Sequence, residues 1–288
     1  RRMSDVPVFF LHGLAYAGLL FLVSSGLTLV FGLMNVLNFA HAAFYMLGAY
    51  FSYTVLKLTG NFWLSMALCP LFLLVLGILI ERFLLRRVHK HGHVHELLLT
   101  FGVAYIIDEL VKLIWGNHPL TVQVTGFLND TVHIFGIEYP VYRLFVFVCA
   151  VVVGVIMYLV IYRTRLGIIV RAAVNDTEMV SALGINVQYL FMGIFGFGAA
   201  LSGLAGVIAG PLLTTSPRMA AEILIDAFVV IVVGGFGSLG GAVVSSFLIG
   251  ELQNFGVLLI PKLSMALIYI LMAGVLILKP EGLFGEAE

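Results

Sequence analysis

Long apolar stretches follow one another along the chain, separated by short polar ones. A helix needs about 20 mostly apolar residues to cross the hydrocarbon core of a bilayer. The stretches that reach or approach this length are 7–31, 36–57, 62–80, 97–115, 141–162, 189–213, 221–235, 238–259 and 263–278. The pattern therefore predicts an all-α, polytopic membrane protein, with residues 1–288 forming one transmembrane domain of eight or nine membrane segments.

Glycines crowd the junction between two of these stretches, 221–235 and 238–259. They are Gly234, Gly235, Gly237, Gly240 and Gly241. Membrane helices contain more glycine than soluble ones, so the crowding does not exclude helices here. It leaves two structures open: two short helices, or one broken and partly re-entrant element.

Composition places the chain in lipid. Of its 288 residues, 61% are hydrophobic and 10% are charged, whereas soluble domains have about 25% charged residues. The fifteen basic and fifteen acidic residues cancel, so nothing indicates a nucleic acid partner. Cys69 and Cys149 both lie in apolar runs and are interpreted as packed thiols, not as a disulfide or a metal site.

Basic residues predict which loops face the cytoplasm. The loop 82–95 and the stretch 163–171 are both rich in arginine, whereas 116–140 contains no lysine or arginine. The first two are therefore expected inside and 116–140 outside, as a periplasmic loop. The C-terminal residues from Lys279 fall inside if the glycine-rich pair crosses twice.

The side of the N-terminus stays open. Arg1 and Arg2 indicate the inside, but three crossings before Arg82 indicate the outside. The opening resembles a secretion signal, yet its apolar run continues to about Phe31 without a small-residue cleavage pattern. A retained membrane helix is the interpretation that fits.

The external loop contains two stretches of alternating polar and apolar residues, 121–124 and 131–134. Such alternation predicts a small hairpin. A hairpin here would serve as a lid or as a landing surface for a soluble partner. An ordinary ordered loop is the alternative.

The cytoplasmic stretch 164–188, called the coupling segment below, contains Glu178 and Gly184 six positions apart. ABC importer permeases have a loop of the form E-A-A-x-x-x-G, which the segment from Glu178 to Gly184 resembles, with Met179 and Val180 in place of the alanines. We expect a short helix with one apolar face for an ATPase groove, ended by Gly184 in a left-handed conformation. Arg171, Asp176 and Glu178 are expected on its solvated face. A plain amphipathic connector is the alternative.

Polar residues at membrane depth supply the candidate substrate path. Asn35, Asn38 and His41 lie between two apolar stretches, where polar groups are costly unless they face a cavity or a partner. A helix broken at Gly32 would expose backbone N–H groups that suit a carboxylate, and amide oxygens suit an ammonium group. The alternative is that these side chains cap helices or join them together.

The glycine-rich region adds further path candidates. Glu222 and Asp226 are four residues apart and share one face of a helix. This helix then runs into Gly234 and Gly235. Glycine-interrupted apolar segments in both parts of a chain are typical of transporters with a site between two repeats, although no residue-for-residue repeat is visible.

A family resemblance appears in a series of motifs. They are Gly26-Leu27-Thr28-Leu29-Val30-Phe31-Gly32, Asn38-Phe39-Ala40-His41, Met46-Leu47-Gly48-Ala49-Tyr50, Thr164-Arg165-Leu166-Gly167, Gly234-Gly235-Phe236-Gly237-Ser238-Leu239-Gly240-Gly241-Ala242 and Lys279-Pro280-Glu281-Gly282-Leu283-Phe284-Gly285. In order and spacing the series resembles the branched-chain amino acid ABC transporter permeases across nearly the whole chain. The short N-terminus is similar to that of the first of the two Liv-type permease subunits.

The resemblance implies a permease of the bacterial inner membrane that works with several partners. These are a second permease (a paralogue or a second copy), two cytoplasmic ATPases and a periplasmic binding protein. ATP and magnesium would be bound by the ATPases, and no cofactor is expected in this chain. Members of the family also carry urea, short amides and small carboxylates. Ala42 replaces the usual glycine, and Asp108 and Glu109 replace amide or apolar residues, which bears on the substrate.

Other polar clusters fit simpler roles. His89, His91, His93 and His95 alternate, so on a helix they point apart, and a solvated cytoplasmic patch is preferred to a metal site. Asp108 and Lys112 are four apart and predict an ion pair. An ion-coupled secondary transporter or channel using Asp108, Glu109 or Asp226 is the rival function.

Enzyme chemistry has no support in the sequence. No glycine–lysine pair exists, so the chain has no phosphate-binding P-loop. No Ser/His/Asp or Cys/His set has a local nucleophile signature either. We therefore expect no catalytic residues in this chain.

Overall fold

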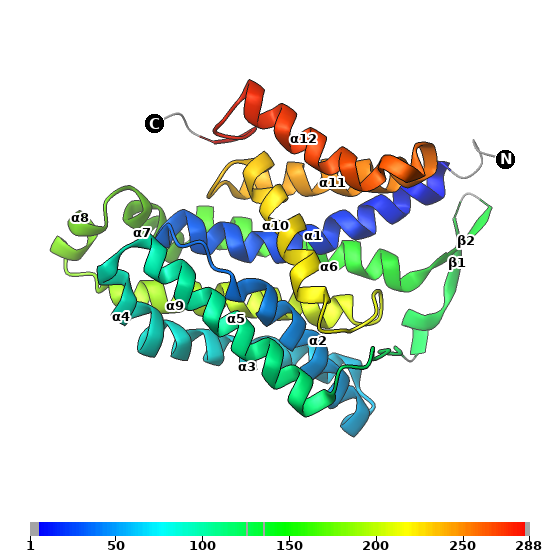
Figure 1. The fold of residues 1–288 in the computed structure, drawn as a ribbon, viewed down its shortest axis with the longest axis horizontal. Coiled ribbons are helices and arrows are strands. Elements are labelled where there is room, and N and C mark those ends of the chain that lie inside the picture. Colours follow the sequence, from blue (N-terminus) through cyan, green and yellow to red (C-terminus); the bar gives the residue numbers. More distant parts are fainter. Residues whose placement is uncertain (1–5, 125, 135, 286–288) are drawn as a thin grey trace.

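The computed structural model describes residues 6–124, 126–134 and 136–285. Its helices are α1 (Val6–Met34), α2 (Ala40–Thr59), α3 (Phe62–Ile80), α4 (Arg86–Val88), α5 (His93–Trp115), α6 (Val141–Arg163), α7 (Arg165–Asn175), α8 (Thr177–Ala182), α9 (Val187–Ala209), α10 (Met219–Gly234), α11 (Leu239–Leu259) and α12 (Ser264–Leu278). Several of the long ones run along the long axis of the molecule (Figure 1). The predicted mostly helical architecture is confirmed. Arg1 and Arg2, the basis for an inner N-terminus, lie outside the described residues.

Five of the described helices are long and apolar enough to cross a bilayer. They are α1, α3 with its continuation to His91, α6, α9 and α11. The other predicted segments coincide with four further helices, of which α10 and α12 are too short and α2 and α5 are long enough but too polar. The structure thus shows a polytopic helical protein without fixing the number of crossings.

Helices α1 and α9 form the centre of the molecule. In their most apolar windows 83% and 78% of residues are buried, compared with 17% in α6. In a bilayer α6 would therefore face lipid, whereas α1 and α9 pack almost wholly against other helices.

Close backbone contact holds α9 against α2. A Cβ atom on Gly206 would stand 1.9 Å from the carbonyl oxygen of Tyr45, and one on Gly48 would stand 2.4 Å from that of Gly203. Membrane helices associate through small residues of this kind, because lipid offers no hydrophobic drive for helix pairing. The two helices are consequently in backbone contact over about one turn.

Two breaks interrupt the helical pattern. Between α1 and α2, residue Asn35 has a positive φ of 51°, and α2 begins only at Ala40, so the predicted helix start at 36 was wrong. The glycine-rich junction forms two separate helices, α10 and α11. Gly235 and Gly237 between them have φ of 98° and 76°, a conformation that glycine adopts without a steric penalty.

The two ends of the molecule differ in structure (Figure 1). Helices α4, α7 and α8 gather at one end, and a β-hairpin extends from the other. The hairpin consists of β1 (Thr131–Ile134) and β2 (Ile137–Pro140), paired antiparallel with Thr131 opposite Pro140. Beside it, Tyr139 Oη and Arg143 Nη1 lie 3.3 and 2.7 Å from His12 Nδ1, so the beginning of α1 is at the hairpin end.

The predicted hairpin is therefore confirmed, but the partner of β1 is β2 and not the stretch 121–124. Residues 121–124 are not a strand, contrary to the alternating pattern. Instead Leu120 forms an isolated antiparallel bridge with Thr215. Val122 is buried and lies where a Cβ on Gly210 would meet it at 3.2 Å. Packing of Val122 under the end of α9 thus replaces pairing with β1.

Candidate functional site

The coupling segment folds into two short helices, α7 and α8, and a side chain caps the start of each. Thr164 Oγ1 accepts a hydrogen bond from Gly167 N at 3.2 Å at the start of α7. Asp176 Oδ1 accepts one from Met179 N at 2.8 Å at the start of α8. Such caps satisfy N–H groups that the first helical turn leaves free. The segment is therefore an ordered element, although it lies outside the long apolar helices.

Gly184 ends α8 as the sequence predicts. Its φ is 85°, and Gly184 N donates to Ser181 O at 3.0 Å while Ile185 N donates to Val180 O at 3.3 Å. These two bonds form a Schellman motif, which requires a left-handed residue at this position. The sharp turn leads directly into α9, where Asn186 Oδ1 accepts a hydrogen bond from Gln188 N at 3.0 Å.

Helix α8 has distinct inner and outer faces. Val180 is buried, whereas Met179 and Leu183 are 58% and 72% exposed. They are four residues apart and so share one face. Leu166 and Ile168 of α7 are exposed as well. Exposed apolar side chains that cluster beyond the membrane helices are typical of a protein-binding surface.

The predicted solvated residues of the segment separate into two groups. Asp176 and Glu178 are exposed, as expected, and Glu178 borders a cavity of about 520 Å³ between α8, the end of α1 and the start of α9. Arg171 was expected in water, but it is half-buried. Its guanidinium group donates to Ile161 O and lies 5.2 Å from the ring centre of Tyr162, because α7 folds back on the end of α6.

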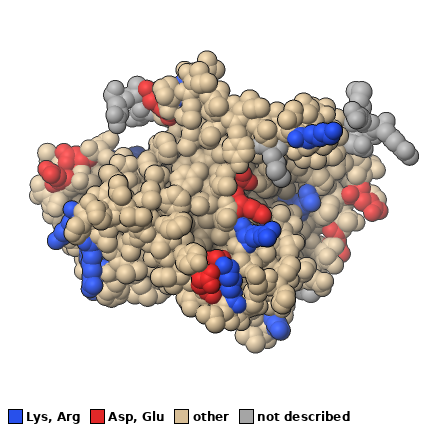
Figure 2. Space-filling view, in the orientation of Figure 1, with Lys and Arg blue, Asp and Glu red and all other residues tan. Residues whose placement is uncertain are grey.

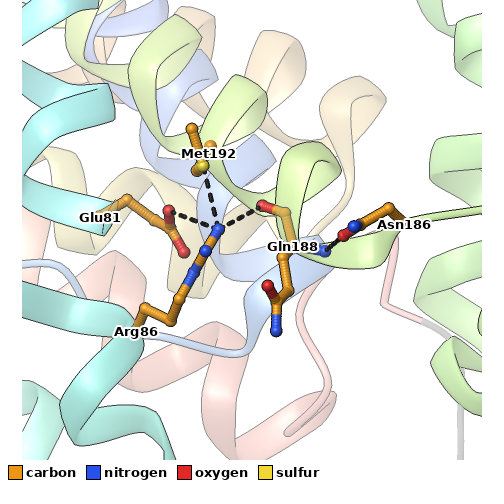
Figure 3. Close-up of polar contacts among 5 residues, drawn as sticks. All are labelled: Glu81, Arg86, Asn186, Gln188 and Met192. Carbon is orange, nitrogen blue, oxygen red and sulfur yellow. Dashed lines mark hydrogen bonds and ion pairs between the residues drawn. The ribbon is translucent and has the colours of Figure 1, made fainter. Parts of the chain in front are cut away.

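An arginine of the short helix α4 contacts the first turns of α9 (Figure 3). Arg86 Nη2 donates to Gln188 O at 3.3 Å and to Met192 Sδ at 3.0 Å. The same nitrogen lies 3.8 Å from Oε2 of Glu81, which is 2% exposed. We call this set of contacts the Arg86 bridge. It joins the C-terminal end of α3 to the helix that follows the coupling segment.

The histidines of the same loop are organised around a buried carboxylate. Glu96 is 2% exposed, and its carboxylate contacts His89 Nδ1 and, at 3.4 Å, His93 Nδ1. His89 also lies edge-on to Phe191 of α9, with ring centres 5.8 Å apart. Within the described residues, no group of three metal-binding side chains comes together. The histidines thus give the loop a second contact with α9.

Asp226, one of the candidate path residues, lies on α10 and contacts α1. It is half-buried on α10 and accepts a hydrogen bond from the Tyr16 hydroxyl at 2.6 Å. Glu222, one turn earlier, is exposed. Neither carboxylate forms an ion pair with a described basic residue. Figure 2 shows acidic side chains beside basic ones in the middle of the face that α10 crosses in Figure 1.

The two asparagines before α2 and the histidine in its first turn occupy different surroundings. Asn35 is exposed and lines a cavity of about 680 Å³ between α1, the α6–α7 junction and the start of α11. Asn38 and His41 are 1% exposed. His41 Nε2 lies 2.8 Å from Val23 O, and Ser202 donates to His41 O at 2.6 Å. His41 thus joins α1, α2 and α9, the arrangement that the sequence left as the alternative.

Gly234 and Gly235 lie where the chain beyond α12 returns to the α10–α11 junction. Leu283 N donates to Val233 O at 2.8 Å, and Phe284 N donates to Gly234 O at 3.0 Å. A Cβ on Gly235 would stand 2.5 Å from Gly285 N. Glycine is therefore needed here for close backbone packing. A role in the path stays a prediction.

The charged group on α5 is an ion pair, as predicted. Lys112 Nζ lies 2.6 Å from Asp108 Oδ2 and 2.9 Å from Glu109 Oε1. One lysine therefore forms ion pairs with two carboxylates on a partly exposed surface.

Sequence reasoning missed the contacts that pair distant segments. Arg86 was used only to orient its loop, and nothing in the sequence singles out Gln188 or Met192 as its partners. Glu251 of α11 was also missed, although both of its carboxylate oxygens are buried without a hydrogen bond from a described residue. An isolated carboxylate in an apolar helix is a signal that could have identified it.

Comparison with known proteins gives a family and close to full-length relatives. Residues 9–276 match the profile of the family described as "Branched-chain amino acid transport system / permease component". The chain is 27% identical to the high-affinity branched-chain amino acid transport system permease protein BraD of Pseudomonas aeruginosa, over 96% of this chain and 95% of that protein.

Two further relatives have similar names. The chain is 25% identical to the high-affinity branched-chain amino acid transport system permease protein LivH of Escherichia coli, over 99% of both chains. It is 28% identical to the probable branched-chain amino acid transport permease protein LivH of Methanocaldococcus jannaschii, over 82% of this chain and 76% of that one. No solved structure matches the chain significantly.

Proposed function

Because the chain belongs to the family of permease components of branched-chain amino acid transport systems, we propose that it is the membrane-spanning subunit of an ATP-driven importer. The family makes it a multi-pass transport component, not a catalytic protein. We propose that it carries branched-chain or related hydrophobic amino acids across the bacterial inner membrane. Urea, short amides and small carboxylates are the alternative substrates within the same class.

The capped helix α8 carries this proposal. It presents Met179 and Leu183 outward, and the turn at Gly184 connects it directly to α9, a central helix of the molecule. Force applied to α8 by an ATPase would therefore reach the helix that touches α1, α2 and α3. Arg171 strengthens the connection, because its contacts with α6 hold α7 to the end of a membrane helix.

Three partner types complete the importer. A second permease, either a paralogue or another copy of this chain, would form the other wall of the path. Two cytoplasmic ATPases would bind ATP and magnesium, and a periplasmic binding protein would deliver the substrate. The β-hairpin is the proposed landing surface for the binding protein, because it extends from the end opposite to α8 (Figure 1).

We propose nine crossings, made by α1, α2, α3, α5, α6, α9, α10, α11 and α12. This topology places 82–95 and 164–188 inside and 116–140 outside, with the described start of α1 outside. Two observations support it: the Arg86 bridge joins the two inner loops, and His12 of α1 touches Tyr139 of the hairpin. The shorter helices α10 and α12 would cross only because neighbouring helices cover their ends.

The proposed substrate path runs past Asp226 and Asn35. Asp226 supplies a carboxylate without a basic partner among the described residues, which suits an ammonium group. Asn35 lines a cavity that Arg171 of the coupling segment also lines. Asn38, His41, Gly234 and Gly235 would hold the walls of the path in place. Weak binding is sufficient, because the binding protein can supply affinity.

The test is capture of the ATPases by the purified chain. We expect Glu178→Ala and Gly184→Pro to abolish co-purification of an ATPase, and Glu138→Ala, an exposed glutamate on the hairpin, to retain it. Substrate uptake into vesicles by this chain alone without ATP would contradict the proposal and favour the ion-coupled rival. Against that rival, Lys112 already neutralises Asp108.

A further inference from the structure

We propose that Arg86 is a positioning residue that couples the movement of α8 and α9 to the cytoplasmic end of α3. This inference rests on the proposed function, because it assigns a route for the force that an ATPase applies to the coupling segment. It adds a branch to α3 that leaves the direct chain from α8 into α9 at the first turns of α9.

The first step of the route is the short path from α8 to Arg86. Only Leu183, Gly184, Ile185 and Asn186 separate α8 from α9. The Schellman turn and the Asn186 cap fix the conformation of this connection. Gln188, whose carbonyl oxygen accepts from Arg86, is the second residue of α9. A displacement of α8 therefore moves the acceptor of the Arg86 bond before it moves the rest of α9.

The second step passes from Arg86 into α3. Its ion-pair partner Glu81 opens a π-helical turn, Glu81–Leu85, that continues α3 without interruption. Such π-helical turns inside α-helices are frequent at functional sites. Glu81 is buried, so displacement of Arg86 would leave a buried carboxylate without its cationic partner, which is energetically costly.

The third step is the set of contacts that the Arg86 side chain makes with α3 and α9. One guanidinium nitrogen reaches a carbonyl oxygen, a thioether sulfur and a carboxylate at once (Figure 3). Lysine would place a compact, strongly hydrated ammonium group here, whereas the guanidinium group of arginine is more weakly hydrated and suits partly buried contacts. Arginine can therefore hold two helices at a defined distance, with contacts on both.

The helices that Arg86 joins are already packed closely further along. A Cβ on Gly77 of α3 would stand 3.0 Å from Gly196 Cα of α9. Close packing makes such helix pairs shift between discrete positions and not deform continuously. With Arg86 in place, α3 would follow α9 from its cytoplasmic end onward, and without it only α9 would receive the push directly.

The experiment compares coupling in the fully assembled importer reconstituted in vesicles. The main variant is the pair Arg86→Met/Glu81→Gln, which removes the bridge without leaving a buried charge alone. Arg86→Lys tests the need for the planar group. The matched control is Arg87→Met, which removes an exposed arginine next in sequence that has no hydrogen bond or ion pair with a described residue. For each, we measure ATPase capture, thermal stability, substrate KM and ATP hydrolysed per substrate imported.

We expect the paired variant to capture ATPase and to keep wild-type KM and thermal stability. Its ATP consumption per substrate should rise about 2- to 30-fold, the usual range for residues that carry energy between sites. Arg86→Lys should show a smaller rise, and Arg87→Met none. A wild-type ratio in the paired variant, or an equal rise in Arg87→Met, would overturn the inference alone. If the wild-type chain captures no ATPase, the proposed function itself fails.

Discussion

Replacing Gly184 by alanine tests the coupling helix through its backbone alone. No described atom lies within 4 Å of the position that a Cβ would take, so alanine meets no steric obstacle from its neighbours. The φ of 85° remains the sole source of strain. For an L-residue with a Cβ, this left-handed conformation costs roughly 1–2 kcal/mol.

That cost converts into a defined loss of affinity for the ATPase. Suppose that the ATPase binds only the conformation in which Gly184 ends α8. Its apparent Kd then rises in inverse proportion to the fraction of permease that keeps this conformation. A cost of 1–2 kcal/mol then corresponds to about 5- to 30-fold weaker binding. Gly184→Asn should lose less, because asparagine tolerates the left-handed region better than alanine does.

Gly193 provides the matched control. It is also exposed and also has no described atom within 4 Å of a built Cβ, but it lies inside α9 with ordinary helical φ. Gly193→Ala should therefore bind the ATPase like the wild type, since alanine is favoured over glycine in a helix. The assay is titration of ATPase onto immobilised, detergent-solubilised permease. Equal affinities of the alanine variants at 184 and 193 would refute the role of the Gly184 conformation.

Two further perturbations test the path and the helix packing. Asp226→Asn should reduce substrate uptake more than Tyr16→Phe does, because only the first removes the carboxylate. A double-mutant cycle on thermal stability should show coupling of about 1.5–3 kcal/mol, the range for a hydrogen bond to a charged group; additive losses would contradict the 2.6 Å bond. Gly48→Ala should destabilise the protein by about 1–3 kcal/mol through overpacking, since the new Cβ meets backbone of Gly203. The control Gly102→Ala meets no described atom within 4 Å and should melt like the wild type, so equal melting temperatures of both variants would count against α2–α9 packing.

Helix positions could be predicted from the sequence because apolar length alone decides them in a lipid-embedded chain. The predicted stretches 62–80 and 238–259 agree with α3 and α11 to within a residue. The start of α2 could not be placed, because apolar residues continue through Val36 and Leu37 while the backbone there forms no regular secondary structure. Only the positive φ of Asn35, a tertiary feature, marks the break.

The local part of the coupling segment was also readable from the sequence. Gly184 was predicted to end α8, because the preference of glycine for a left-handed helix end acts locally. The caps at Thr164 and Asp176 were not predicted, although they rest on equally local preferences. The solvated position expected for Arg171 was wrong because the fold-back of α7 onto α6 is a tertiary contact.

Long-range pairings remained out of reach for the same reason. Tyr16 and Asp226 are 210 residues apart, and Arg86 and Met192 are 106 apart. Each of these residues has an ordinary local environment in the sequence. Which alternative held for His41 likewise depended on where α1 and α9 lie around α2.

Cysteine labelling measures most directly whether the coupling segment faces the cytoplasm and meets an ATPase. In a chain with Cys69→Ala and Cys149→Ala, Leu183→Cys places a thiol on the outer face of α8, and Glu138→Cys places one on the hairpin. A membrane-impermeant maleimide should modify the first only in inside-out vesicles, with protection by added ATPase, and the second only in right-side-out vesicles. Modification of position 183 in right-side-out vesicles would contradict the account.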